Sequence, residues 1–344
     1  MVTKIRSKKL LIVSLFLLLL VFGCTTLKQE TKKTEQKKQD KPFVPSLKEN
    51  TPEVVPPLNG VNSSNTNQPI VSPPPVSDSS TTQSRDEQTV ASSAPLIYSG
   101  GSCPTLVEGE NSNFVSAGIS RRFILRVPSN PSGAKVMFAW HAHGGTPLIA
   151  LQGLGFDRIY SDANMFVVAP YASGKTQYEW FFSSDPENNP DLIFFDDVRA
   201  CLKKQYDVDL TQVATAGFSA GALWSSYLLV ERPDDISTAA ILSGGLTSDS
   251  YYTTVKNVPT LIEWGGAGDV ASGFPFESAS LDFSKKLRSD GNFVVECRGN
   301  QGHGPPTFSS EYTWMFLRDH FKKGASESYR NGLPNGFPTQ CRIP

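Results

Sequence analysis

The chain has 344 residues, a formal net charge of −1 and 39% hydrophobic residues. This length and composition allow one large folded domain with appended segments. The balanced charge gives no indication of a nucleic-acid partner, and it favours a neutral or weakly charged substrate over one steered by a strong field.

Residues 1–23 predict a secretory signal peptide. Basic side chains at residues 4–9 precede an apolar run over residues 10–22, which is too short to span a bilayer comfortably. The run ends in Val-Phe-Gly followed by Cys24, which resembles a bacterial lipobox, although Phe22 departs from the small residue preferred there. We therefore expect an exported protein anchored to the lipid bilayer of the cell envelope through Cys24, with an ordinary secreted protein as the alternative.

Residues 24–100 predict a disordered tether. A stretch rich in Lys, Gln, Glu and Thr gives way to one rich in Pro, Ser, Asn and Thr. Such a segment cannot bury enough apolar surface to offset the entropy cost of ordering it. A flexible tether of this length has a root-mean-square span of about 45 Å. The remaining residues, 101–344, form the predicted folded domain.

Strands and helices alternate through the predicted domain. Short apolar runs predict strands at residues 122–127, 135–140, 165–169, 213–216, 239–242, 260–264 and 293–297. Helices are expected between them, including 192–206 and 279–288, and a last helix at 311–321. This alternation predicts an α/β fold with a mostly parallel sheet and helices on both faces. In such a sheet the reactive groups lie at the carboxyl ends of strands.

The sequence Gly217-Phe218-Ser219-Ala220-Gly221 lies where a buried strand is expected to turn into a helix. This is the layout of a nucleophile elbow, in which a sharp turn exposes the serine hydroxyl and the glycines let strand and helix pass closely. The pentapeptide alone is weak, because an ordinary Gly/Ser turn has the same letters. Its position between strand and helix favours Ser219 as a catalytic nucleophile.

Two further strand ends carry the groups that a serine nucleophile needs. Asp269 follows the strand at 260–264, and His303 lies between glycines after the last strand. A histidine base takes the serine proton, and a carboxylate on the far ring nitrogen fixes the tautomer. The chain order Ser219, Asp269, His303 is that of the α/β-hydrolase fold. The alternatives are an incidental turn histidine and an aspartate that caps the next segment.

The other three histidines are assigned different roles. His141 and His143 precede the nucleophile, and His320 falls in the last helix, where we expect a surface or capping role. A metal site built from His141 and His143 is a weak alternative, because no carboxylate or cysteine cluster lies nearby. We therefore expect neither a metal nor a cofactor.

An oxyanion hole is expected from backbone N–H groups. One donor is Ala220, directly after the nucleophile. The other is assigned to Gly145 in the segment His143-Gly144-Gly145-Thr146, which follows the strand at 135–140.

Four of the five cysteines remain once Cys24 is set aside, namely Cys103, Cys201, Cys297 and Cys341. An even number in an exported protein predicts disulfides. We favour a bridge between Cys103 and Cys341, because they flank the folded region. A second bridge or two buried free thiols remain open for Cys201 and Cys297.

Taken together, these motifs over residues 103–321 resemble a group of secreted esterases that contains polyhydroxybutyrate depolymerases, feruloyl esterases and acetyl xylan esterases. The resemblance implies hydrolysis of a carboxylic ester through an acyl-enzyme, without a cofactor, on extracellular polyesters or polysaccharide-linked esters. It assigns Ser219 as nucleophile, Asp269 as acid and His303 as base.

The chain departs from this group at two places. The group often has a tryptophan two residues after the histidine, where this chain has Pro305, so an aromatic wall of the substrate site is missing. The group also often has cysteine where Gly145 stands. The loop 171–190, with Tyr178, Trp180, Phe181 and Phe182, either replaces that aromatic surface or anchors itself by packing.

Two other functions stay open. A serine peptidase of the same fold uses the same triad, although no repeat domain that would gate peptides is apparent. A catalytically silent lipoprotein that binds a polymer at the envelope is the other. Covalent labelling by a fluorophosphonate distinguishes both enzymes from this binding protein, because an unactivated serine does not react.

Overall fold

The computed structural model describes residues 96–174, 176, 179–182, 185–247, 253–304, 309–322 and 326–344. They belong to one compact unit, Asp86–Pro344. The predicted signal peptide, Cys24 and nearly all of the predicted tether lie outside the described residues. Among the helices of the described part, none has the length and apolar character needed to cross a bilayer.

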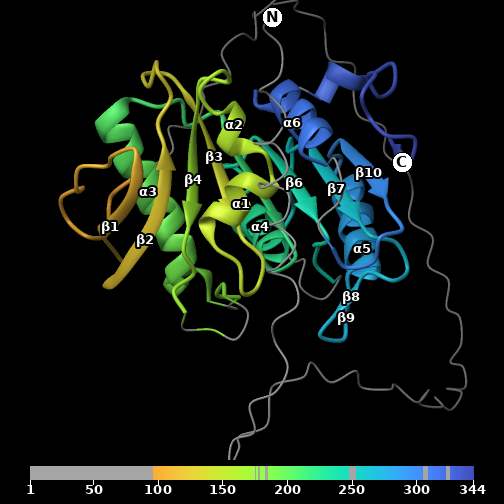
Figure 1. Ribbon diagram of the computed structural model, residues 1–344, viewed down its shortest axis with the longest axis horizontal. Coiled ribbons are helices and arrows are strands. Elements are labelled where there is room, and N and C mark those ends of the chain that lie inside the picture. The colour runs from red at the N-terminus through yellow and green to blue at the C-terminus, as the bar shows by residue number, and fades with distance from the viewer. Residues whose placement is uncertain are drawn as a thin grey trace, which may run out of the picture. The chain divides into compact units, whose positions relative to one another are not determined.

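A nine-stranded sheet forms the centre of the fold, in the order β1-β2-β4-β3-β5-β6-β7-β10-β11 (Figure 1). Its strands are β1 (Gly109–Ser116), β2 (Ile119–Arg126), β3 (Lys135–Trp140), β4 (Met165–Pro170), β5 (Val213–Phe218), β6 (Thr238–Leu242), β7 (Thr260–Trp264), β10 (Val294–Arg298) and β11 (Cys341–Arg342). The six strands from β4 to β10 in this order run parallel, and β1, β2 and β11 join the two edges antiparallel. The carboxyl ends of the six parallel strands therefore all lie at the same end of the sheet.

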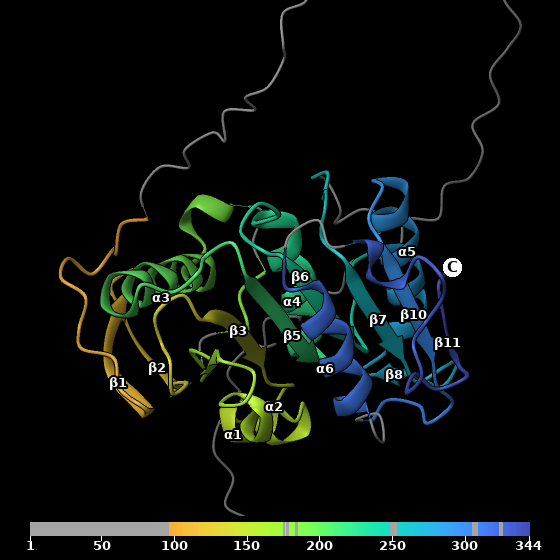
Figure 2. The same cartoon turned by 90° about the horizontal axis from the view of Figure 1, so that it is seen from above.

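Helices cover both faces of the sheet, so this unit has three layers (Figure 2). On one face lie α3 (Pro190–Tyr206), α4 (Ala220–Glu231) and α5 (Phe276–Ser289), and on the other α1 (Pro147–Gly153), α2 (Phe156–Ile159) and α6 (Ser309–His320). Among the described residues, the other elements are a small hairpin of β8 (Val270–Ala271) and β9 (Phe274–Pro275) and two short 3-10 helices, Pro186–Asn188 and Ser326–Tyr329. This arrangement is the α/β-hydrolase fold predicted from the sequence.

Strand alternation divides the core into two layers. In β3, the side chains of Phe138 and Trp140 pack with those of α3 and α4, whereas Met137 and Ala139 pack with those of α1 and α2. Successive side chains of a strand point to opposite faces, so a strand covered on both faces must be apolar throughout. This explains why β3 and β7 match the predicted strands at 135–140 and 260–264 residue for residue.

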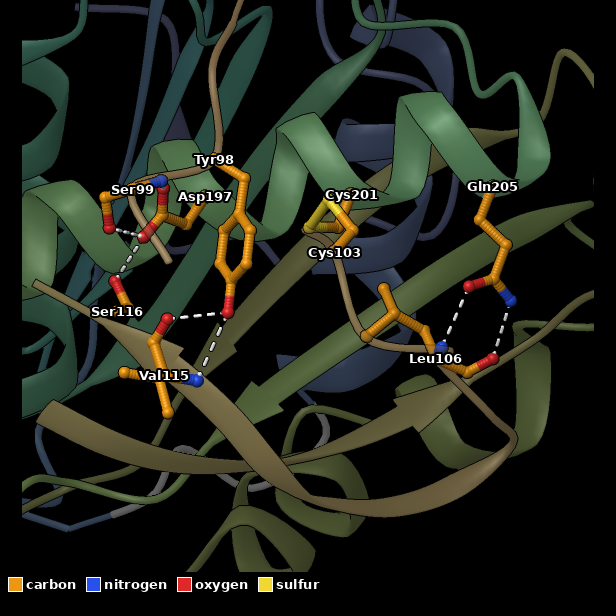
Figure 3. The surroundings of a disulfide bond; sticks show 9 residues. All are labelled: Tyr98, Ser99, Cys103, Leu106, Val115, Ser116, Asp197, Cys201 and Gln205. Carbon is orange, nitrogen blue, oxygen red and sulfur yellow. Dashed lines mark hydrogen bonds between the residues drawn. A yellow bond between two sulfur atoms is a disulfide. The ribbon is translucent and has the colours of Figure 1, made fainter. Parts of the chain in front are cut away.

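The segment just before β1 lies along α3 (Figure 3). Three contacts fasten it at successive turns of the helix: Ser99 hydrogen-bonds with Asp197, Cys103 forms a disulfide with Cys201, and Leu106 hydrogen-bonds with Gln205. The hydroxyl of Tyr98 also donates to the carbonyl of Val115 at 2.6 Å. Because β1 is an edge strand, this contact covers a backbone group that would otherwise be open to pairing.

The predicted bridge between Cys103 and Cys341 is wrong. The disulfides join Cys103 to Cys201 and Cys297 to Cys341. Cys103 lies along α3 near β1, whereas Cys341 stands in β11 directly opposite Cys297 of β10. The two ends of the folded region therefore lie at opposite edges of the sheet. Flanking positions in the sequence did not correspond to neighbouring positions in the fold.

His320 is buried rather than placed at the surface. Its Nδ1 bonds to the Phe316 carbonyl at 2.7 Å, and its ring stacks on those of Phe316 and Phe293. Burial lowers the pKa of His320, because the charged ring would lose its hydration, and so favours the neutral form.

Candidate active site

Ser219 occupies a strained turn between β5 and α4. Its backbone has φ 55° and ψ −121°, a conformation that side-chain-bearing residues rarely adopt. A Cβ atom on Gly217 would lie 2.3 Å from the carbonyl carbon of Gly221, and one on Gly221 would lie 2.2 Å from the Trp140 oxygen. Only glycine fits at both positions, so the motif is a true nucleophile elbow.

The three predicted side chains meet in one hydrogen-bonded relay. Ser219 Oγ lies 2.9 Å from His303 Nε2, and His303 Nδ1 lies 2.7 Å from Asp269 Oδ1. These distances are those of direct hydrogen bonds. Serine, base and acid come from segments following β5, β10 and β7, whose carboxyl ends share one edge of the sheet.

The Asp269 carboxylate is buried but well supplied with donors. Its second oxygen, Oδ2, accepts from the Gly265 N–H at 2.7 Å and the Ser243 hydroxyl at 2.8 Å. Burial alone would raise the pKa of Asp269, but the bonds from His303, Gly265 and Ser243 outweigh it and lower the pKa. The carboxylate therefore remains charged and can stabilise a protonated imidazole. The role of Ser243, at the end of β6, was not predicted.

Two phenyl rings stack against the His303 imidazole. The ring centroids of Phe276 and Phe218 lie 4.3 and 5.3 Å from that of His303, each with an interplanar angle of 23°. Phe276 begins α5, and its N–H donates to the carbonyl oxygen of Asp269. The rings limit rotation of the imidazole, so its two nitrogens stay directed at Ser219 and Asp269.

The backbone donors differ from the prediction in part. Ala220 is the first residue of α4, so its N–H has no acceptor within the helix. The Gly145 N–H, by contrast, donates to the Ala142 carbonyl at 2.9 Å and closes a turn. The assignment of Gly145 as the second oxyanion donor is therefore wrong for this conformation. In the described part of this loop, the N–H groups of Ala142 and His143 have no hydrogen-bond acceptor.

Both ring nitrogens of His141 are hydrogen-bonded to backbone groups of the protein. Its Nδ1 donates to the Ala142 carbonyl at 2.8 Å, and its Nε2 accepts from the Ala172 N–H at 3.3 Å. Burial lowers the pKa of His141 and keeps the ring neutral. Both nitrogens are occupied, which leaves no lone pair for a metal shared with His143.

The described aromatic side chains of the loop after β4 include one that is buried and one that is exposed. Trp180 is only 1% exposed and packs on Trp140 and Trp224, so it anchors the loop. Phe182 is 40% exposed beside Trp224 and Tyr227. Tyr178 and Pro305 lie outside the described residues.

The fold is the α/β-hydrolase fold, and the three hydrogen-bonded side chains have the geometry of a Ser-His-Asp triad. Neither a protein-family model nor a curated protein sequence matches the chain.

Solved structures do match. The native structure of a protein designated pOPH aligns with a TM-score of 0.55 and 18% identity, over 70% of this chain and 96% of that one. A second protein, sOPH, aligns with a TM-score of 0.54 and 15% identity, over 72% and 96%. A carboxylesterase from Bacillus cereus aligns with a TM-score of 0.44 and 14% identity, over 57% and 93%. The first two matches show a shared fold.

Proposed function

We propose that the protein is a serine carboxylic-ester hydrolase that acts through an acyl-enzyme. The observation that carries the proposal is the continuous relay from Ser219 through His303 to Asp269, with bonds of 2.9 and 2.7 Å. A serine hydroxyl is a poor nucleophile until a neighbouring base takes its proton. The relay provides that base in a fixed orientation.

The proposed reaction has two halves. His303 Nε2 takes the Ser219 proton while Oγ attacks the ester carbonyl carbon, and the carbonyl oxygen becomes negatively charged. The protonated His303 then gives its proton to the leaving alcohol, and the acyl group stays on Ser219. A water molecule, deprotonated by His303, attacks the acyl-enzyme and releases the acid. The Ala220 N–H supports the negative oxygen in both halves.

We further propose polyesters or esters linked to polysaccharides as substrates, from the resemblance of residues 103–321 to secreted esterases. A panel of acetyl, butyryl, feruloyl and polyhydroxybutyrate esters distinguishes among them. A serine peptidase of the same fold is the second candidate, and it would cleave peptide bonds through Ser219.

We also propose that the protein is exported and anchored through Cys24. Two disulfides use four of the five cysteines, and Cys24 is the fifth. Disulfides persist in oxidising compartments, which fits an exported protein. Metabolic labelling with a fatty acid should label the wild-type chain and not Cys24→Ser. An unlabelled wild-type protein would contradict the anchor.

The hydrolase proposal is tested on the full chain purified in detergent. Wild-type protein should hydrolyse p-nitrophenyl butyrate, and Ser219→Ala should abolish hydrolysis. Ser129→Ala, at an exposed serine far from the relay in sequence, is the matched control and should retain the wild-type rate. Equal rates for wild type and Ser219→Ala would overturn the proposal.

A further inference from the structure

The long connection between β4 and α3 holds the loop that follows β3, here named the oxyanion loop (His141–Gly145). Glu179 Oε1 accepts the Gly144 N–H at 2.9 Å and lies 3.4 Å from His143 Nδ1. Glu179 itself has φ 71°, in the left-handed region that residues with a side chain seldom occupy. The contacts of Glu179 and of the following Trp180 maintain this conformation.

The neighbouring Trp180 holds the start of the same loop. Its indole N–H donates to the His141 carbonyl at 3.2 Å, and its ring lies 4.9 Å from the imidazole of His141. Two consecutive residues of one connection thus hold both the beginning and the tip of the oxyanion loop. The sequence gives no hint of this contact, because Glu179 and Gly144 are far apart in the chain.

These contacts decide which amides of the loop are available. Gly144 has φ 69° and donates to Glu179, and Gly145 donates to the Ala142 carbonyl. Nearer the tip of the loop, the N–H groups of Ala142 and His143 have no acceptor among the described residues. The loop follows β3 directly, and the Trp140 and His141 carbonyls pack against Gly221 in the first turn of α4. The loop therefore starts next to the first turn of α4, which directly follows Ser219.

We propose that Glu179 is a positioning residue that fixes the oxyanion loop and so presents a free amide of Ala142 or His143 as the second donor, beside Ala220. This rests on the proposed function, because only an acyl-transfer reaction generates the negative oxygen. The hydrogen bond from Gly144 to Glu179, here called the clamp, needs an acceptor atom on residue 179 and not its charge, because the backbone N–H that it holds is neutral. Glutamine at this position therefore preserves the clamp, and alanine removes it.

The kinetic test uses the full chain with p-nitrophenyl butyrate. Glu179→Ala should lower kcat by about 10- to 100-fold with little change in KM, because loss of an oxyanion donor weakens the transition state alone. Glu179→Gln should restore most of the activity. Glu187→Ala removes an exposed carboxylate from the same connection and is the matched control. Inhibition by a trifluoromethyl ketone, which forms a tetrahedral oxyanion on the serine, should weaken in Glu179→Ala by the same factor as kcat.

A second measurement does not depend on hydrolysis. Hydrogen exchange of the peptide that contains Gly144 should be faster in Glu179→Ala than in wild type, and unchanged in Glu187→Ala. Unchanged kcat and unchanged exchange in Glu179→Ala would overturn the clamp. Faster exchange with unchanged kcat would overturn its role in the reaction. A wild-type protein that neither hydrolyses esters nor reacts with a fluorophosphonate would instead overturn the proposed function, while the exchange result still decides the clamp.

Discussion

Two carboxylic acids in or just after β7, Asp269 and Glu263, are both buried, with exposed fractions of 0% and 4%. Their pKa values are nevertheless shifted in opposite directions. The pKa of Asp269 is lowered, whereas burial raises the pKa of Glu263 to about 7. The difference lies in their hydrogen-bond donors. Asp269 faces His303, Ser243 and the Gly265 N–H, and Glu263 hydrogen-bonds only with the Tyr312 hydroxyl among the described side chains.

The comparison shows that burial alone does not suit a carboxyl group to catalysis. An acid that is to stabilise an imidazolium must be charged, and a buried charge is stable only when several donors compensate its lost hydration. The fold provides those donors around Asp269, beyond the carboxyl end of β7. It does not provide them around Glu263, inside β7.

The largest expected effect is on catalysis. Asp269→Asn should lower kcat for ester hydrolysis by roughly 10⁴-fold, because the amide favours the wrong tautomer of His303. Glu263→Gln is the matched control, since it neutralises the other buried acid in the same region, and its kcat should stay within about twofold of wild type. Comparable losses in both variants would show that the two acids are not distinct in function.

The second effect is on stability. In the folded protein Glu263 has a pKa of about 7, above its ordinary value of 4.5, so protonation stabilises the fold. This contribution is complete below pH 4.5 and is lost as the pH rises through 7. Relative to Glu263→Gln, wild type should lose about 3 kcal/mol of unfolding free energy over that range. Denaturant unfolding at pH 4 and pH 8 measures it, and a parallel pH dependence in both proteins would contradict the assignment.

The smallest effect concerns one donor to Asp269. Removing the Ser243 hydroxyl should raise the pKa of Asp269 and lower kcat/KM by about two- to tenfold, the worth of one hydrogen bond. Ser243 has φ 50°, a conformation that is strained for serine and alanine but not for glycine. Ser243→Ala therefore removes the hydroxyl and keeps the strain, whereas Ser243→Gly removes the hydroxyl and relieves the strain. Both variants should lose activity alike. A loss in alanine alone would point to the backbone instead of the hydroxyl.

The relay could be predicted from the sequence because each of its residues is marked by the segment directly before it. Ser219, Asp269 and His303 each follow an apolar run that could only be a strand covered on both faces, and parallel strands bring their carboxyl ends together. The order of elements was enough to place the three side chains near one another. Glu263, by contrast, lies within its strand and hydrogen-bonds with Tyr312.

The rest depended on contacts between distant segments. The oxyanion loop has a motif, but which of its amides is free is decided by Glu179, from another connection. The Cys103–Cys201 disulfide depends on how the segment before β1 runs along α3, and the Cys297–Cys341 disulfide depends on the pairing of β11 with β10. Neither arrangement leaves a pattern in the sequence. Strand β1 was missed because its residues, Gly109–Ser116, are mostly polar, as suits an exposed edge.

The most direct test of the central claim is to map the adduct that a fluorophosphonate forms with the full chain. Peptide mass spectrometry should find the adduct on Ser219 and nowhere else, and His303→Ala should slow its formation strongly, because the hydroxyl then has no base. An unlabelled protein, an adduct on another residue, or an unchanged rate in His303→Ala would contradict the account.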